Sequence, residues 1–74
     1  MDKNHDLEKR FGSKLCYIRK ERKLSQVKLA EIADLNFNYI GQIERAEANV
    51  TIKTIKTLAN ALNIEVKELF DFSF

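Results

Sequence analysis

The chain has 74 residues, 45% of them hydrophobic, with 13 basic and 11 acidic side chains and a formal net charge of +2. A chain of this length can form one small domain and leaves no room for a second domain or a deep substrate cleft. The single cysteine, Cys16, excludes an internal disulfide and a cysteine-based zinc cage. With no apolar run long enough to cross a membrane and no signal peptide, we expect a cytoplasmic protein.

Basic residues are concentrated in one part of the sequence. Residues 9–28 hold eight basic side chains and one acidic one, whereas from Leu29 onward four basic residues face seven acidic ones. This asymmetry suits a domain whose one side approaches a polyanion, although a solvated helix face explains it nearly as well.

Hydrophobic periodicity and the absence of proline predict an all-α fold, a bundle of five short helices. The apolar positions of the first helix, over residues 6–22, are Leu7, Phe11, Leu15 and Ile18. Gly12 lies inside this helix at a cost of up to about 1 kcal/mol relative to alanine, which indicates a close approach by another element.

The second and third helices are separated by a short turn. Ser25 is a suitable N-cap for the second helix, whose apolar positions are Leu29, Ala30 and Ala33. Asp34 tolerates the left-handed backbone conformation at the exit of that helix, and Asn36 can cap the third helix, over residues 37–45. The polar face of the third helix consists of Asn38, Gly41, Gln42 and Arg45. Glu44 lies nearer the apolar side, which is an odd place for a charge.

The rest of the chain predicts a polar loop and two further helices. In the loop over residues 46–50, we expect Asn49 to have a positive φ. Thr51 caps the fourth helix, whose apolar positions are Ile52, Ile55, Leu58, Ala59 and Leu62. A short fifth helix begins near Glu65 and continues into an aromatic tail. Residues 1–5 are expected to be frayed, and residues 64–74 to serve dimerisation.

Catalysis has little support in the sequence. His5 is the only histidine, and Cys16 has no suitable histidine partner. The sequence has neither a glycine-rich phosphate loop nor a carboxylate pair with the spacing for acid–base work. We therefore expect no enzyme activity, no metal site, no cofactor and no small-molecule ligand.

The polar face of the third helix is the better candidate for function. Amide side chains can pair with the adenine edge in the major groove, and an apolar ring can meet a thymine methyl group. Asn36, Asn38 and Gln42 supply the amides, and Phe37 supplies the ring. The alternative is a plain solvated helix face, on which Asn and Gln are common.

Five segments of the sequence together form a recognisable pattern. They are SQ at residues 25–26, LAEIA at 29–33, YIGQIER at 39–45, TIKTIKTLANALNI at 51–64 and ELF at 68–70. In this combination the chain resembles the phage-repressor and Cro-like helix-turn-helix family of bacterial regulators, which includes small restriction-modification controller proteins. The resemblance implies a single lambda-repressor-like domain over residues 1–74, with the second and third helices as the helix-turn-helix.

The resemblance also implies roles for individual residues. The base-facing positions would be Asn36, Phe37, Asn38 and Gln42. Phosphate contacts would come from Gln26, Tyr39, Arg45, Asn49, Thr51 and Lys53, helped by the N–H groups that open the fourth helix. Arg19 and Glu44 would form a largely buried ion pair, so that Arg19 serves the fold rather than DNA. Asp34 and Ala46 depart from the family pattern, which often has glycine at both positions.

The leading hypothesis is a homodimeric, sequence-specific transcriptional regulator of a restriction-modification or phage-type operon. Two-fold dimers of this kind read double-stranded DNA at pseudopalindromic half-sites one turn apart, about 34 Å. The dimer interface would consist of Val66, Phe70, Phe72 and Phe74, unless the tail folds back onto its own core. Other hypotheses are an antitoxin that binds its operator and a toxin, and a protein-interaction module that does not read DNA.

Overall fold

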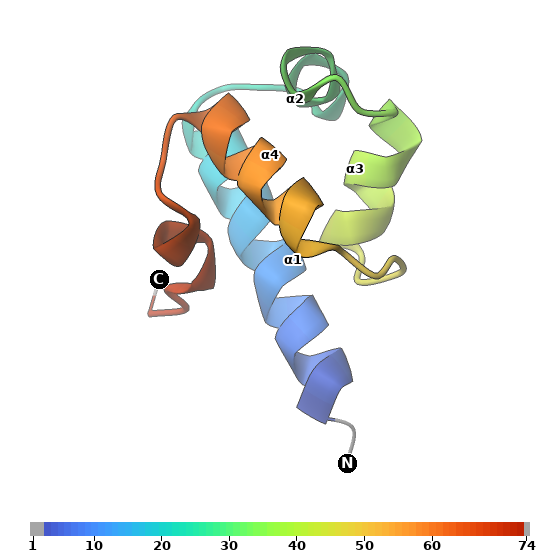
Figure 1. Cartoon of the computed structure of the whole chain (residues 1–74), viewed down its shortest axis with the longest axis vertical. Helices are drawn as coiled ribbons and strands as arrows, with labels where there is room; N and C mark the ends of the chain where they lie inside the picture. Colours follow the sequence, from blue (N-terminus) through green and yellow to red (C-terminus); the bar gives the residue numbers. More distant parts are fainter. Residues whose placement is uncertain (1–2, 74) are drawn as a thin grey trace.

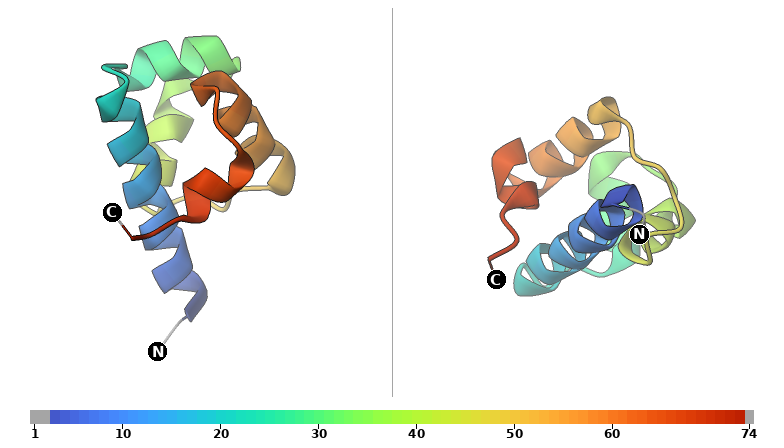
Figure 2. Two further views of the ribbon diagram at one scale, coloured as in Figure 1. Left: turned by 90° about the vertical axis from the view of Figure 1, so that its left-hand side faces the viewer. Right: turned by 90° about the horizontal axis from the view of Figure 1, so that it is seen from below.

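This computed structural model describes residues 3–73, which form four α-helices and one 3-10 helix joined by loops. They are α1 (Lys3–Glu21), α2 (Gln26–Ala33), α3 (Phe37–Glu44), α4 (Ile52–Leu62) and the 3-10 helix η1 (Val66–Phe70). In Figure 1, α1 is the long axis of the molecule and α2 lies across its C-terminal end. The views in Figures 1 and 2 place α3 and η1 on opposite sides of α1.

The predicted all-α fold with its helix-turn-helix is confirmed, but the prediction of a fifth α-helix is wrong. Val66–Phe70 forms a 3-10 helix, the form that runs of a few residues commonly take. Reciprocal hydrogen bonds between Glu65 and Glu68 fix its start, and the backbone is extended again at Asp71. At the other end of the chain, α1 begins at Lys3, earlier than predicted. The side chains of residues 1–5 lie outside the described part of the structure.

The core fills the space enclosed by the four α-helices and η1. Its fully buried large side chains are Leu15, Leu29, Ile40, Ile43, Leu58, Leu62 and Leu69. These residues come largely from the predicted apolar faces, because helical periodicity places them on one side of each helix. Leu7 and Ile52 are exceptions, since their side chains are 47% and 86% exposed. Their apolar surface is therefore available for contacts outside the core.

Polar caps define the helix boundaries as predicted. The side-chain oxygens of Ser25, Asn36 and Thr51 accept hydrogen bonds from backbone N–H groups in the first turns of α2, α3 and α4. Asp34 ends α2 in the left-handed region, with φ of 58°. Because these bonds satisfy groups that a helix end leaves unpaired, they fix where α3 begins relative to α2.

Gly12 lies where α1 crosses the C-terminal end of α3. A Cβ atom on Gly12 would lie 2.5 Å from the carbonyl oxygen of Ile43 and 2.8 Å from that of Glu44. Both oxygens are backbone atoms, so they could move only if the end of α3 moved with them. The close approach that the sequence indicated is confirmed, and it sets the distance between α1 and α3.

The loop after α3 turns at Ala46 rather than at Asn49. Ala46 has a φ of 61°, and Asn49 is not among the residues with positive φ. The Ala46 N–H donates to the Ile43 carbonyl oxygen, and the next N–H, from Glu47, donates to that of Gln42. These bonds at the helix end require the left-handed conformation at this position whichever residue occupies it. A side chain in that conformation is strained by about 1–2 kcal/mol.

Replacing Ala46 with glycine is therefore expected to stabilise the protein. Glycine removes the strain that a Cβ atom causes at positive φ. This gain should exceed the cost of ordering the more flexible glycine, so the free energy of unfolding should rise by about 1 kcal/mol. Urea denaturation measures this difference. Ala48→Gly, in the same loop but at negative φ, should instead destabilise the protein. A lower stability of Ala46→Gly than of the wild type would contradict this account.

Candidate nucleic-acid interface

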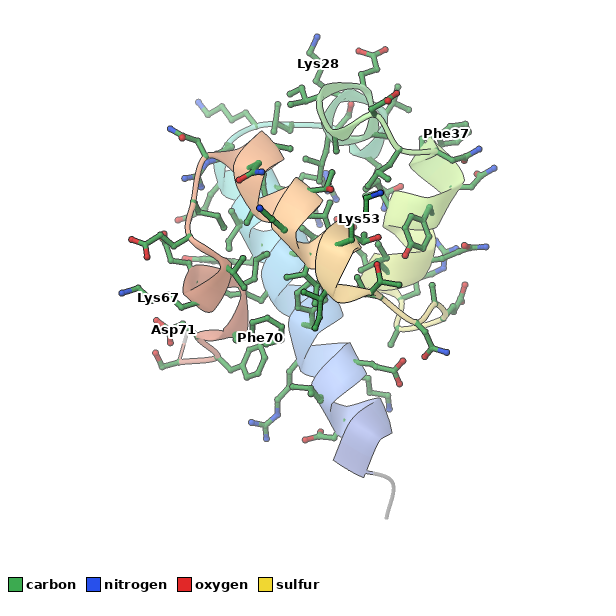
Figure 3. The ribbon with its side chains drawn as sticks, in the orientation of Figure 1. Lys28, Phe37, Lys53, Lys67, Phe70 and Asp71 are labelled. Carbon is green, nitrogen blue, oxygen red and sulfur yellow. The ribbon has the colours of Figure 1, made fainter. Side chains whose placement is uncertain are left out.

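The outer side of α3 and its N-cap carry the side chains that are predicted to face DNA bases. Asn36, Phe37, Asn38 and Gln42 are all exposed, whereas Ile40 and Ile43 of the same helix are buried. Figure 3 shows Phe37 at the N-terminal end of α3, pointing away from the domain, and 51% of its surface is exposed. The buried isoleucines hold α3 on the core, so the exposed side chains project from a fixed helix.

Asn36 differs from the other two amides because it is already engaged. Its Oδ1 accepts a hydrogen bond from the Asn38 N–H at 2.8 Å, which caps α3. Bidentate pairing with adenine uses both the oxygen and the nitrogen of an amide. Asn36 would have to give up its cap for such pairing, so Asn38 and Gln42 are the amides best placed to provide it.

A buried ion pair connects α1 to the C-terminal end of α3. Arg19 Nε lies 2.6 Å from Glu44 Oε2 and Arg19 Nη2 lies 3.1 Å from Glu44 Oε1, with side chains only 8% and 6% exposed. Arg19 Nη1 also donates to the Leu24 carbonyl oxygen at 2.7 Å. The two residues that the resemblance pairs are thus joined in a bidentate contact. It explains why Glu44 stands on the apolar side of its helix.

The charges of this pair stabilise each other. Burial alone would raise the pKa of Glu44, but hydrogen bonds from Arg19 and Gln26 outweigh it and hold that pKa below its usual value. The hydrogen bond with Glu44 raises the pKa of Arg19. Both groups are therefore ionised at neutral pH.

Gln26 is attached to the same carboxylate. Its Nε2 donates to Glu44 Oε1 at 2.9 Å, which joins the start of α2 to the end of α3. The family resemblance implies a DNA phosphate as the partner of Gln26 and does not indicate this bond to Glu44. Gln26 and Glu44 are 18 positions apart and are brought together by tertiary packing, so no local pattern indicates the bond. The only sign of it in the sequence is the charge of Glu44 on the apolar side of its helix.

The other predicted phosphate contacts come from the region between α3 and α4. The Tyr39 hydroxyl donates to the Asn49 carbonyl oxygen at 3.3 Å, which ties the loop to α3. Arg45 pairs with Glu47 at 3.1 Å, and both side chains are more than half exposed. Thr51 Oγ1 caps α4, and the exposed Lys53 follows in its first turn. This arrangement brings Tyr39 and Asn49 together directly, and Thr51 follows on the same loop.

The predicted dimerisation residues divide into two groups. Val66 and Phe70 remain 41% and 37% exposed, and they line a hollow between α4 and η1 together with Ile52 and Ile55. The sequence analysis places Ile52 on the apolar face of the fourth helix, but in the structure it lies outward at the start of α4, a difference that periodicity alone does not indicate.

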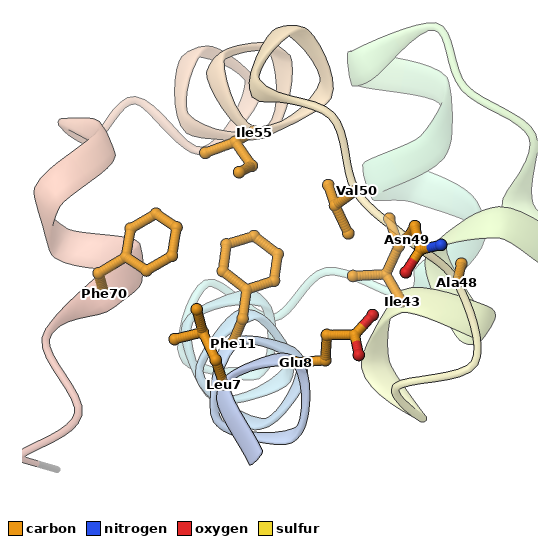
Figure 4. A pocket seen from close by; sticks show the side chains of 9 residues that line it. All are labelled: Leu7, Glu8, Phe11, Ile43, Ala48, Asn49, Val50, Ile55 and Phe70. Atoms are coloured by element: carbon orange, nitrogen blue, oxygen red, sulfur yellow. The ribbon is translucent and has the colours of Figure 1, made fainter. Parts of the chain in front are cut away.

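The tail beyond η1 returns towards α1 of the same chain. Phe70 packs on Phe11 with ring centroids 5.2 Å apart, at the edge of a hollow of about 320 Å³ beneath α4 (Figure 4). Phe72 is half-buried beside Phe70 and lines a hollow with Lys9 and other residues of α1. Phe74 lies outside the described residues. Part of the aromatic tail thus packs on its own monomer.

The described residues contain neither a membrane-spanning helix nor a cluster of metal-ligating side chains. No helix there combines the length and the apolar content needed to cross a membrane. No three histidine, cysteine, aspartate or glutamate side chains lie together in a way that could hold a metal ion.

The comparisons with known proteins agree with this geometry. Residues 17–69 match a family model described as Helix-turn-helix. The chain is 42% identical over 64 residues to the control protein C.SmaI of Serratia marcescens, covering 86% of this chain and 76% of that protein. The solved structure of the restriction-modification controller protein C.AhdI from Aeromonas hydrophila superimposes with a TM-score of 0.84 at 41% identity, covering 85% of this chain and 96% of that one.

A phage protein is also similar. The immunity repressor protein of Bacillus phage phi105 is 45% identical over 58 residues, which cover 78% of this chain. The matched segment spans only 40% of the repressor's own length. The similarity therefore concerns one part of that repressor, whereas the controller proteins match along most of their length.

Proposed function

Because the chain belongs to the helix-turn-helix family of transcriptional regulators, we propose that it recognises a specific DNA sequence with the exposed side of α3. The observation that carries this proposal is the pair of exposed amides, Asn38 and Gln42, on a helix anchored by buried isoleucines and by Glu44. The two amides are four positions apart, so they lie on the same face of α3. Side chains on rigid elements give the geometric precision that base recognition needs.

In this proposal the amides of Asn38 and Gln42 pair with adenine edges in the major groove, and Phe37 meets a thymine methyl group. Asn36 contributes its NH₂ group while its oxygen caps α3. The residues that contact phosphates are Gln26, Tyr39, Arg45, Asn49, Thr51 and Lys53. The N-termini of α2 and α4 add backbone N–H groups, which favour anions.

The base-reading role predicts that Asn38→Ala and Gln42→Ala lose sequence preference. Each substitution should cost about 1–3 kcal/mol per half-site of the preferred sequence, roughly 5- to 150-fold in affinity for each half-site, with little change on unrelated DNA. The preferred sequence is first selected from a random library, and mobility shifts are then measured at two salt concentrations.

Lys53→Ala is the matched control for this experiment. A phosphate contact carries no sequence information, so its loss should weaken binding to all sequences similarly and reduce the salt slope by about 0.9 for each protomer bound. If Asn38→Ala and Gln42→Ala behave as Lys53→Ala does, or leave binding unchanged, α3 does not read bases through these amides.

We further propose that the protein acts as a homodimer through Ile52, Val66 and Phe70. These apolar side chains are exposed around one hollow between α4 and η1. A second copy related by two-fold symmetry would cover the same surface on both protomers. Two copies of α3 would then read half-sites one turn apart, as in other dimers of this architecture.

Val66→Asp is expected to convert the dimer into monomers, because a charge would be buried at the interface. Sedimentation measures the change directly, and circular dichroism checks that the monomer is folded. Val27→Asp is the control, since Val27 is also about half-exposed, at 48%, but lies on α2 away from this surface. A Val66→Asp protein that remains dimeric would show that another surface is used.

We propose a restriction-modification operon as the regulated target. The support is the similarity to controller proteins along most of their length, which the longer phage repressor does not share. The DNA upstream of the protein's own gene is accordingly the first region in which to look for the selected sequence.

A further inference from the structure

The hollow beneath α4 is lined mostly by apolar side chains, some of which the fold leaves partly uncovered. It has a volume of about 320 Å³ and lies among α1, α4, η1 and the loop after α3. Leu7 and Phe70 line it and remain 47% and 37% exposed, whereas Phe11 is buried. Pockets for small molecules in proteins begin at roughly this size, about 300 Å³, and are lined mainly by hydrophobic and aromatic residues. The space is therefore large enough for a small organic molecule.

Two polar side chains stand on one side of this hollow. Figure 4 shows the Glu8 carboxylate and the Asn49 side chain there, with the rings of Phe11 and Phe70 towards the opposite side. Glu8 is half-buried, and among the described residues no ion pair or side-chain hydrogen bond engages its carboxylate. The hollow thus combines an aromatic end with an end that carries a negative charge, and no described residue supplies the matching cation.

We propose that this hollow binds a small amphiphilic amine. The apolar body of the ligand packs against Phe11 and Phe70, where an aromatic ring finds favourable edge and face contacts. Its ammonium group donates a charge-assisted hydrogen bond to the Glu8 carboxylate and a second hydrogen bond to the side-chain oxygen of Asn49. An anion is repelled by Glu8, and an uncharged ligand leaves the carboxylate without a cation.

The site departs from the expectation that the protein has no small-molecule ligand. Four segments that are far apart in the sequence form the hollow, so no local pattern indicates it. The site is also independent of the proposed function, since none of the side chains assigned to bases lines it.

Three compounds with the same apolar body test the charge preference of the hollow: phenylbutylamine, phenylbutanol and phenylbutyrate. Each is titrated into the isotope-labelled protein at pH 7 and followed by NMR. We expect the amine to bind with a dissociation constant in the millimolar range, which is typical of ligands with so few atoms, and to show nuclear Overhauser contacts with the rings of Phe11 and Phe70. The alcohol should bind about fivefold more weakly, because it cannot form the ion pair with Glu8, and the acid more weakly again.

Glu8→Gln removes the charge and keeps the shape of the hollow. In this variant the amine should bind about fivefold more weakly than in the wild type, and no more tightly than the alcohol. Glu31→Gln is the matched control, because Glu31 is an exposed carboxylate on α2 that does not line the hollow. The control should bind all three compounds as the wild type does. An equal loss in both variants would show an effect of net charge and would overturn the role of Glu8.

Ala48→Leu tests the hollow itself. Ala48 lines it, so the larger side chain takes up space that the ligand needs, and the binding of all three compounds should be lost. The melting temperature should be unchanged or higher, because the added apolar atoms fill a space that is already present. Should Ala48→Leu fail to fold, the contacts of the amine with Phe11 and Phe70 in the wild type decide where it binds.

Four results would overturn the proposal. The amine may fail to bind, or bind no more tightly than phenylbutyrate. Its binding may persist in a folded Ala48→Leu protein, or its contacts may lie outside the hollow. If the signals of Leu7 and Phe11 shift with protein concentration and not with the amine, a second copy of the chain covers the hollow instead.

Discussion

Arg19→Ala is expected to lower the free energy of unfolding by about 3–5 kcal/mol, because it leaves a buried carboxylate without its partner. The side chain of Glu44 is only 6% exposed, and Arg19 provides two of its hydrogen bonds. The substitution also removes the donor to the Leu24 carbonyl oxygen. Urea denaturation at pH 7 measures the loss. Lys20→Ala, a neighbouring exposed position, should change stability by no more than about 0.5 kcal/mol.

The loss in Arg19→Ala should depend on pH. In the wild type the pKa of Glu44 lies below its ordinary value of 4.5. The stability that comes from its ionisation is therefore complete above pH 4.5 and disappears as the pH falls through the lowered pKa. Without Arg19, burial dominates and raises that pKa, so Glu44 takes up a proton more readily. The two proteins should therefore approach each other in stability as the pH falls, because the variant recovers stability when its Glu44 is protonated and the wild type loses stability below pH 4.5. A difference that stays constant with pH would contradict the buried pair.

Gly12→Ala should be the second severe substitution, with a loss of about 2 kcal/mol or more in the free energy of unfolding. Alanine is the better helix former by about 1 kcal/mol, which alone would predict stabilisation. The opposite sign is expected because the methyl group would lie within 3 Å of two backbone oxygens at the end of α3. Thermal or urea denaturation decides between the two signs.

Two alanine substitutions serve as controls for Gly12→Ala. Ser13→Ala, at the next and exposed position of α1, should leave stability unchanged or slightly higher. Gly41→Ala should also be tolerated, because only the ends of flexible side chains lie near its new methyl group. A Gly12→Ala protein as stable as these two would show that α1 and α3 can move apart at little cost.

Much of the fold could be predicted because its determinants are local. The apolar faces follow from helical periodicity, and Ser25, Asn36 and Thr51 cap helices through bonds to residues two or three positions away. Ala46 could not be identified in this way, since the hydrogen bonds at the end of α3 select the turning position over the intrinsic preference of Asn49.

The candidate site was predictable as a set of residues but not as an arrangement. The amides of Asn38 and Gln42 are visible in the sequence, as is the misplaced charge of Glu44. The hydrogen bond from Gln26 to Glu44 joins two helices, and no local sequence pattern indicates which polar side chains of two helices will meet. The same holds for the exposure of Ile52, which depends on what the surrounding helices leave uncovered.

The close contact at Gly12 also bears on how the protein would meet its operator. Because the space between α1 and α3 at Gly12 is too small even for a Cβ atom, α3 has little freedom to tilt towards α1. In the proposed homodimer, little of the adjustment needed to seat two α3 helices in successive grooves can then come from within a protomer, and we expect the double helix to supply part of it by bending and twisting at a cost that depends on its sequence. Base steps between the half-sites would thereby influence affinity, although no side chain reaches them.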